Sequence, residues 1–192
     1  MEIFKDLPVV LFGNQAQWRD WLEDNHKQAQ GIWLKLAKKS SGVVSVSYAE
    51  ALEEALCYGW IDSQKQGHDD NFWLQKFTPR GIKSVWSKVN VKSAEILIES
   101  GRMKPAGLES VELAKHDGRW QEAYDSPATN TIPEDFQVAL DKNPKAKRFF
   151  ETLNKANTYA FCWRIQTAKK PETRKARIEK FIDMLSKNEK LH

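Results

Sequence analysis

The stretch SYAEALEEALCYGWIDSQ, residues 47–64, contains a helix, the end of that helix and the beginning of a strand. Ser47 and Glu50 have the spacing of a capping box, which satisfies the first backbone N–H groups of a helix. Gly59 is placed to end the helix in the left-handed conformation, and an extended segment begins at Trp60. Apolar residues follow the helical period between these ends: Tyr48, Ala51, Leu52, Ala55 and Leu56.

A second strand is predicted after this unit. NFWLQKF, residues 71–77, alternates with the period of a strand, and the polar residues 63–70 before it suit a turn. The two strands are therefore predicted to form a hairpin. Two more strands are predicted upstream, at residues 9–12 (VVLF) and 31–39 (GIWLKLAKK), with a helix between them.

The remaining chain is predicted to be helical. Helices are expected after Asn90 and after Pro105, and four further helices follow a connector at residues 119–131. The fold class is thus α+β, with a small, mostly antiparallel sheet of about four strands packed by helices in residues 1–125. An all-helical part at residues 130–192 follows, and we expect the two parts to pack as one compact unit.

Composition points to a folded protein outside the membrane. Hydrophobic residues make up 41% of the 192 residues and charged residues 29%, which are ordinary values for a globular protein. The sequence contains no apolar run of the roughly 18 residues that a membrane helix needs. Residues 1–13 lack the pattern of a secretory signal peptide, so a cytoplasmic protein is expected.

No pattern of metal ligands or cofactor-binding residues stands out. Cys57 and Cys162 lie far apart within apolar helical patterns, and buried reduced thiols are expected, with a disulfide as the alternative. His68, Asp69 and Asp70 are adjacent and cannot complete a metal shell alone, so a solvated turn is favoured. We therefore expect no metal and no cofactor.

Positive charge is concentrated near the end of the chain. Residues 144–192 contain 13 Lys and Arg against 5 Asp and Glu, a net charge of +8, whereas the rest of the chain carries −4. Lys170, Arg174 and Arg177 are spaced to form a basic surface on one helix face. Such a surface would attract nucleic acid, although a solvated helix face without a partner is favoured.

Candidate ligand-binding residues gather around the predicted hairpin. Asp62 and Arg80 lie near ends that a hairpin brings together, where they would form either a structural ion pair or two sides of a ligand site. The run from Thr78 mixes cations, hydroxyls and an aromatic residue, as expected of a corner that binds phosphate or sulfate, or of a loop that only caps the next helix. The candidate residues are Trp60, Asp62, Thr78, Arg80, Ser84, Trp86, Lys88 and Asn90.

Several blocks of the sequence resemble one bacterial family. EALEEALCYGWIDSQ at residues 50–64, FTPR at 77–80, SVWSKVN at 84–90, GRMKPAG at 101–107 and TAKKPETRKARIEKFIDML at 167–185 are similar to the YdeI/OmpD-associated, or bacteriocin-protection, proteins. The resemblance implies a role in stress or antimicrobial-peptide resistance and supplies no catalytic residues.

The function predicted from these observations is that of a ligand-binding or interaction protein. Its partner would be a small or anionic ligand, or a protein, bound in a pocket near Asp62. Two alternatives remain. One is an enzyme that uses Asp62 as an acid or base, and the other is a nucleic-acid-binding protein that uses the basic C-terminal helices.

Overall fold

The computed structural model describes residues 2–127 and 129–191, and these residues form two compact units. The first unit contains the chain up to residue 84 together with residues 90–121. The second unit contains residues 85–89 together with the chain from residue 122 onward. The short segment 85–89 was not expected in the second unit, because nothing in its sequence connects it with residues such as Tyr124, which pairs with Ser87.

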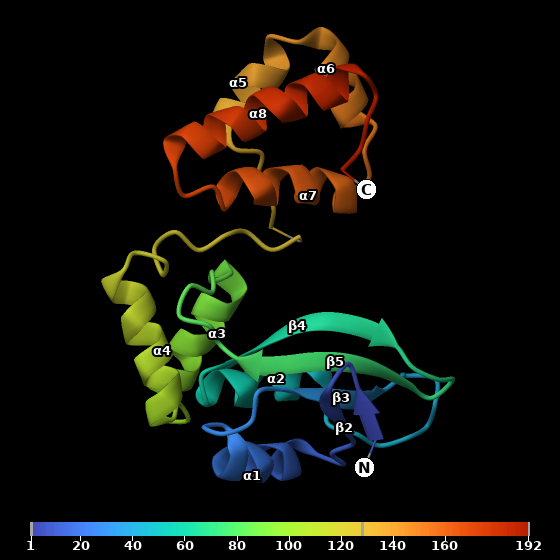
Figure 1. Cartoon of the computed structure of the whole chain (residues 1–192), viewed down its shortest axis with the longest axis vertical. Helices are drawn as coiled ribbons and strands as arrows, with labels where there is room; N and C mark the ends of the chain where they lie inside the picture. Colours follow the sequence, from blue (N-terminus) through green and yellow to red (C-terminus); the bar gives the residue numbers. More distant parts are fainter. Residues whose placement is uncertain (1, 128, 192) are drawn as a thin grey trace. The chain divides into compact units, whose positions relative to one another are not determined.

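The first unit is built on a five-stranded sheet with the strand order β1-β2-β3-β5-β4 (Figure 1). Every neighbouring pair of strands is antiparallel except β2 and β3, which are parallel. This arrangement confirms the predicted α+β class with a mostly antiparallel sheet. The strands are β1 (Glu2–Phe4), β2 (Leu7–Val10), β3 (Ile32–Ala37), β4 (Trp60–Gly67) and β5 (Phe72–Pro79).

Strand β1 is the strand that the sequence analysis missed. It forms a hairpin with β2, in which Phe4 lies opposite Leu7 across the two-residue turn of Lys5 and Asp6. Both turn residues are left-handed, with φ angles of 47° and 63°. Such a turn usually contains Asn-Gly or Asp-Gly. Because Lys-Asp is not a recognised turn pair, the sequence contains no signal for this hairpin.

Helices α1 (Gln15–Asn25) and α2 (Tyr48–Cys57) share a core with the sheet. Trp18 of α1 is fully buried, with its ring 5.7 Å from the ring of Phe77 and 6.4 Å from that of Trp60. Its indole Nε1 donates a hydrogen bond of 3.0 Å to the carbonyl oxygen of Ala51. The predicted capping box of Ser47 and Glu50 is present at the start of α2.

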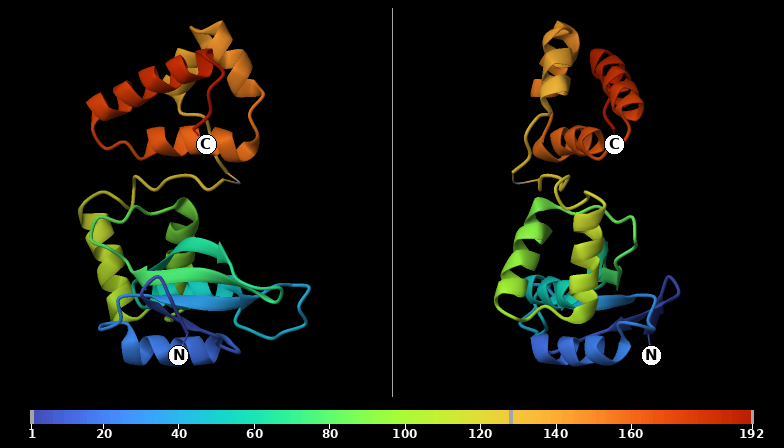
Figure 2. Two further views of the ribbon diagram at one scale, coloured as in Figure 1. Left: turned by 45° about the vertical axis from the view of Figure 1, so that its right-hand side comes forward. Right: turned by 90° about the vertical axis from the view of Figure 1, so that its left-hand side faces the viewer.

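Helix α2 ends against α4 (Pro105–His116), which runs beside α3 (Lys88–Glu99) (Figure 2). Gly59 has a φ angle of 71°, which confirms its predicted left-handed conformation. A Cβ atom at this position would lie 2.7 Å from the carbonyl oxygen of Ala106 in α4, so the close approach also requires glycine. Helix α3 begins at Lys88 rather than after Asn90, so the predicted start of this helix was wrong by three residues.

The second unit consists of helices around their own apolar core, as predicted. These helices are α5 (Glu134–Asp141), α6 (Pro144–Glu151), α7 (Lys155–Gln166) and α8 (Pro171–Ser186). The core contains edge-to-face aromatic pairs, such as Phe161 and Phe181 with ring centroids 5.1 Å apart. Residues 85–89 join this unit through a parallel bridge between Ser87 and Tyr124.

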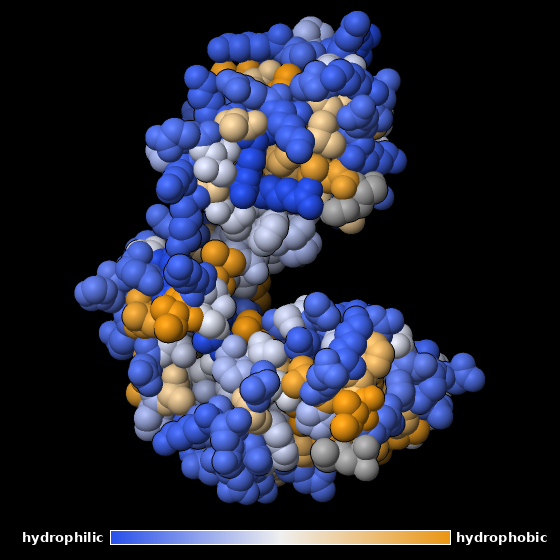
Figure 3. Space-filling view, in the orientation of Figure 1, coloured by the Kyte–Doolittle hydropathy of each residue, from blue (hydrophilic) through white to orange (hydrophobic). Residues whose placement is uncertain are grey.

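Hydrophilic side chains cover most of the face shown in Figure 3, with smaller groups of apolar side chains between them. None of the described helices has both the length and the apolar character that crossing a bilayer requires.

Candidate functional site

The structure places Asp62 and Arg80 in different surroundings. Asp62 lies opposite Phe77 in the β4–β5 hairpin, whereas the backbone N–H of Arg80 donates to the carbonyl oxygen of Gly59 at 2.9 Å. The two residues are thus three positions apart along the strand pair, and side chains alternate between the faces of a sheet. The Asp62 carboxylate instead accepts a hydrogen bond of 2.8 Å from the hydroxyl of Tyr48.

Tyr48 and Trp73 form the walls of a hollow that we name the aromatic groove. Their ring centroids are 6.1 Å apart, and the ammonium group of Lys65 lies 4.4 Å from the Trp73 ring centroid. The groove has a volume of about 670 Å³. Its other walls are the end of β3 and the loop before α2, residues 36–47 without Ser40 and Ser41. Tyr48 connects it to Asp62, so only Asp62 of the predicted site residues is next to the groove.

Arg80 lines a second and smaller hollow of about 180 Å³, which we name the arginine hollow. Arg119 lies on the same hollow and is only 4% exposed. Its Nε atom donates to the carboxylate of Asp117 at 2.7 Å, and its Nη1 atom donates to the carbonyl oxygen of Ser84 at 2.8 Å. The full lining is Arg80, Gly81, Ile82, Glu109, Ser110, Leu113 and Arg119.

Arg119 was not among the predicted site residues. It follows α4 in a connector that has no periodic pattern, and its contact with Ser84 joins positions 35 residues apart. The only available signal was its charge. Ser84 itself was predicted, and the structure shows that its carbonyl oxygen holds the Arg119 guanidinium.

The other predicted ligand-binding residues are dispersed. Trp60 is 1% exposed and donates through its indole Nε1 to the carbonyl oxygen of His26 at 3.1 Å, so it belongs to the core. Thr78 is half-buried in β5, and Asn90 lies in the first turn of α3. Trp86 and Lys88 belong to the second unit, where the Trp86 carbonyl oxygen accepts from the backbone N–H of Tyr124 at 3.0 Å.

Lys88 forms an ion pair with a buried carboxylate of the second unit. Its ammonium group lies 2.7 Å from Asp125, which also accepts hydrogen bonds from Thr131 at 2.8 Å and from Gln166 at 3.0 Å. Burial alone would raise the pKa of the Asp125 carboxyl, but these hydrogen bonds hold that pKa below its usual value. The carboxylate therefore stays charged at neutral pH and fixes residues 85–89 to the second unit.

Two of the three cations of the predicted basic surface have partners within the second unit. Arg174 makes a two-pronged contact with the carboxylate of Asp135, at 2.6 and 2.8 Å, and its Nη1 atom donates to the carbonyl oxygen of Ile165. Arg177 donates through Nη1 to the carbonyl oxygen of Arg164. Lys170 lies at the N-cap of α8. These contacts reduce the charge that the helix face can offer to a nucleic acid.

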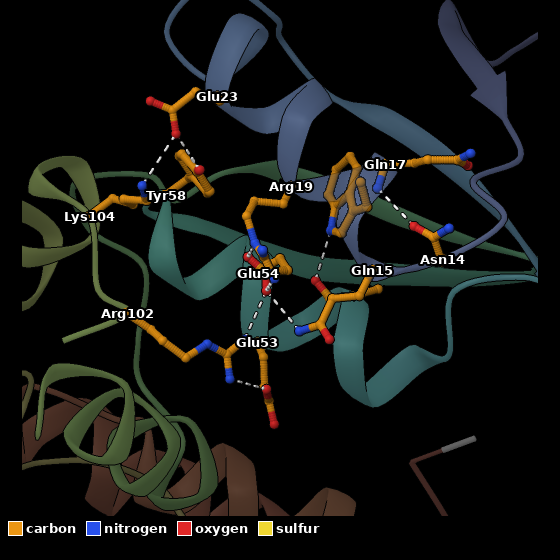
Figure 4. Close-up of polar contacts among 12 residues, drawn as sticks. Asn14, Gln15, Gln17, Arg19, Glu23, Glu53, Glu54, Tyr58, Arg102 and Lys104 are labelled. Atoms are coloured by element: carbon orange, nitrogen blue, oxygen red, sulfur yellow. Dashed lines mark hydrogen bonds and ion pairs between the residues drawn. The ribbon is translucent and has the colours of Figure 1, made fainter. Parts of the chain in front are cut away.

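A buried carboxylate joins α1, α2 and the segment after α3 in the first unit (Figure 4). Glu54 is 2% exposed and accepts hydrogen bonds from Arg19 at 3.0 Å, from Arg102 at 2.8 Å and from Gln15 at 2.7 Å. Burial would raise the pKa of Glu54, but the two guanidinium groups hold it below its usual value. With this many donors from its own unit, Glu54 serves to hold the fold together.

The two cysteines are free and buried, as predicted. Burial raises the pKa of the Cys57 thiol to about 11 and also raises that of Cys162. His68 lies 3.5 Å from the carboxylates of both Glu2 and Asp69. Among residues 2–127 and 129–191, no group of three His, Cys, Asp or Glu is arranged to hold a metal ion.

Comparison with known proteins identifies a separate family in each part of the chain. Residues 10–110 match a domain of unknown function, DUF8412. Residues 129–188 match the family described as bacteriocin-protection, YdeI or OmpD-associated. No curated protein and no solved structure matches the chain.

Proposed function

The chain belongs to the DUF8412 family, whose model matches residues 10–110, and we propose that it is a non-catalytic ligand-binding protein. Residues 129–188 match the bacteriocin-protection, YdeI or OmpD-associated family. The role of the protein is to help cells resist stress or antimicrobial peptides. The description of the second family supports this role, and the aromatic groove of the first unit supports ligand binding.

The size and walls of the groove are the observation that carries the proposal. Its volume of about 670 Å³ falls within the range of roughly 300–1,000 Å³ that is typical of ligand sites. Tyr48 and Trp73 offer flat apolar surfaces, and the hydrogen bond to Asp62 fixes the Tyr48 ring in one orientation. Fixed aromatic walls lose little conformational entropy when a ligand binds.

The groove offers apolar surface on Tyr48 and Trp73, while Lys38 and Lys39 line it and Lys65 lies over the Trp73 ring. A peptide with apolar and cationic side chains would place its apolar side chains on the two rings and a cation at the Asp62 carboxylate beside Tyr48. The Asp62 carboxylate can accept further hydrogen bonds besides the one from Tyr48, because an ionised carboxylate has about four acceptor sites. Amphipathic peptides rich in Lys and apolar residues include many antimicrobial peptides.

Thermal denaturation with a synthetic Lys/Leu amphipathic peptide tests the proposal, because a ligand that binds the native state raises the Tm by mass action. The full chain, Trp73→Leu and Trp163→Leu would be compared. Trp163 is a half-buried tryptophan of the second unit and serves as the matched control. We expect the peptide to bind wild type and Trp163→Leu alike, and Trp73→Leu at least about tenfold more weakly.

Two outcomes would contradict the proposal. Equal binding by both tryptophan variants would remove the groove as the ligand site. Cleavage of the peptide by wild type but not by Asp62→Asn would establish the enzyme alternative instead. A Lys/Ser peptide of the same charge is the control for purely electrostatic attraction, and we expect it to leave the Tm unchanged.

A further inference from the structure

The guanidinium group of Arg119 has one nitrogen without a described partner. Nε bonds to Asp117 and Nη1 bonds to Ser84, but Nη2 is shielded from solvent and has no hydrogen-bond partner among the described residues. Nearly all buried donors in folded proteins are satisfied, so an orphaned one requires an explanation. The side chain is only 4% exposed and lies on the arginine hollow, which suggests that the missing acceptor enters from that hollow.

A second arginine, Arg80, lines the same hollow. It comes from the end of β5, whereas Arg119 follows α4, so two separate parts of the first unit bring positive charge to one small space. The charge of Arg119 is balanced by Asp117, but its Nη2 atom still lacks an acceptor among the described residues. An anion in the hollow would supply that acceptor and would be attracted by both arginines.

The volume of the hollow limits the size of the occupant. About 180 Å³ corresponds to roughly six water molecules and is below the usual range for drug-sized ligands. A single phosphate group is within this size, while the apolar body of a larger ligand would remain outside. Ile82, which is 73% exposed, and Leu113, which is 40% exposed, also line the hollow and could contact such a body.

Two carboxylates are also present and set the charge balance. Asp117 is bonded to Nε of Arg119 and Ser84 to Nη1, which leaves Nη2 for another acceptor. Glu109 lies on the hollow but is exposed, so water and salt screen its charge. The Ser110 hydroxyl already donates to the carbonyl oxygen of Ala106 at 3.1 Å. The arginines are therefore the side chains that would hold an anion.

We propose that the arginine hollow binds a phosphate group, with Nη2 of Arg119 and the guanidinium group of Arg80 as the donors. This site is separate from the aromatic groove and does not depend on the function proposed for it. Arginine suits the role because its planar fork of N–H groups matches the oxygens of phosphate. The phosphate group is either free or part of a larger molecule whose remainder contacts Ile82 and Leu113.

Calorimetric titration of the full chain with inorganic phosphate, at constant ionic strength set by chloride, tests this proposal. Arg119→Lys keeps the positive charge but removes the planar fork of N–H groups. Arg174→Lys is the matched control, because Arg174 is an arginine of the second unit whose guanidinium group is bound to Asp135. We expect Arg119→Lys to bind phosphate at least tenfold more weakly and Arg174→Lys to bind it like wild type. Trp73→Leu should also bind phosphate normally.

The proposal is overturned if phosphate does not bind, or if it binds wild type and Arg119→Lys equally, since the latter would show general attraction to a basic chain. Should Arg119→Lys fail to fold, Arg80→Lys replaces it with the same expected loss. A crystal of the full chain soaked in tungstate gives an independent readout, in which anomalous density should lie within reach of Arg119. A phenyl phosphate titration then separates the two sources, because tighter binding than inorganic phosphate would indicate a phosphorylated molecule.

Discussion

The hydroxyl of Tyr48 donates a hydrogen bond of 2.8 Å to the carboxylate of Asp62, which links the first turn of α2 to strand β4. The two residues are 14 positions apart, and the helix and Gly59 lie between them. The contact therefore connects the start of helix α2 with the strand that follows Gly59. It also fixes the orientation of the Tyr48 ring, which is one wall of the aromatic groove.

A double-mutant cycle measures this contact. Tyr48→Phe removes only the hydroxyl, and we expect it to lower the free energy of unfolding by about 0.5–1 kcal/mol, because the site is partly exposed. Asp62→Asn should cost a similar amount alone and little more in the Tyr48→Phe background. Chemical denaturation of wild type, the two single variants and the double variant gives the coupling free energy between Tyr48 and Asp62. Strictly additive effects would show that the hydrogen bond contributes nothing to stability.

The buried carboxylate of Glu54 should matter far more than its neighbour Glu53. Glu54→Gln leaves Arg19 and Arg102 without their shared charge partner, and we expect a loss of about 1–3 kcal/mol in the free energy of unfolding. Glu53 pairs with Arg102 through a side chain that is 45% exposed, so Glu53→Gln should cost less than about 1 kcal/mol. Equal losses in the two variants would contradict this ranking.

The same pair of variants predicts a pH dependence. The pKa of Glu54 is lowered in the folded state, so its stabilising effect is complete above the unfolded pKa of about 4.3 and is lost as pH falls through the lower folded value. The stability difference between wild type and Glu54→Gln should therefore be constant from pH 7 to about pH 5 and shrink below that. Urea denaturation at each pH measures it. A stability difference that grows in acid would mean that folding raises the pKa of Glu54 instead of lowering it.

Gly59 is expected to tolerate alanine much less well than Gly118. Both glycines have positive φ angles, 71° and 82°, so each alanine pays the left-handed penalty of about 1–2 kcal/mol. A Cβ atom at Gly59 would also lie 2.7 Å from both the Ala106 carbonyl oxygen and the Ser110 hydroxyl, whereas nothing lies within 4 Å at Gly118. We expect Gly59→Ala to lose about 1–3 kcal/mol more. Equal melting temperatures would refute the close packing of α2 on α4.

The thiol of Cys57 should be unreactive in the folded protein. Its pKa is raised to about 11 by burial, so almost no thiolate exists at pH 8, and the thiolate is the reactive form. A chromogenic thiol reagent is expected to label neither Cys57 nor Cys162 before unfolding and both of them in denaturant. Rapid native labelling of one equivalent would show that one of these helices opens readily.

Nucleic-acid binding through α8, if present, should depend on Lys170 and not on Arg174. Arg174 is held by Asp135 and by the carbonyl oxygen of Ile165, so Arg174→Gln should lower stability by about 1 kcal/mol without changing a DNA mobility shift. Lys170→Gln should weaken any such shift and reduce its salt dependence. Loss of DNA binding in Arg174→Gln with unchanged stability would support the predicted basic surface as a nucleic-acid site.

Local features of this chain were predictable from sequence because their causes are local. The capping box of Ser47 and Glu50 and the left-handed Gly59 depend on residues within a few positions, and the alternation in β5 depends on neighbours along one strand. The hairpin around Lys5 and Asp6 was missed because its residues adopt a conformation that their type rarely takes.

The site residues were harder to predict because long-range contacts bring them together. Arg119 meets Ser84 across 35 positions, and Arg174 meets Asp135 across 39. The hairpin itself was predicted, but its turn is shorter than the expected residues 63–70, because β4 continues to Gly67. Pairing Asp62 with Arg80 required knowledge of the exact register and of which face each side chain takes. The register places Asp62 opposite Phe77, beside Tyr48, and it leaves Arg80 to another hollow.

The bridge between Ser87 and Tyr124 has a practical consequence for dividing the gene. A fragment that starts at residue 122 would lose Lys88 and leave Asp125 as an uncompensated charge beneath the surface. Swapping modules between homologues at the apparent border would create the same defect. A graft that transplants residues 85–89 along with the C-terminal helices should express well, and one that omits them should not.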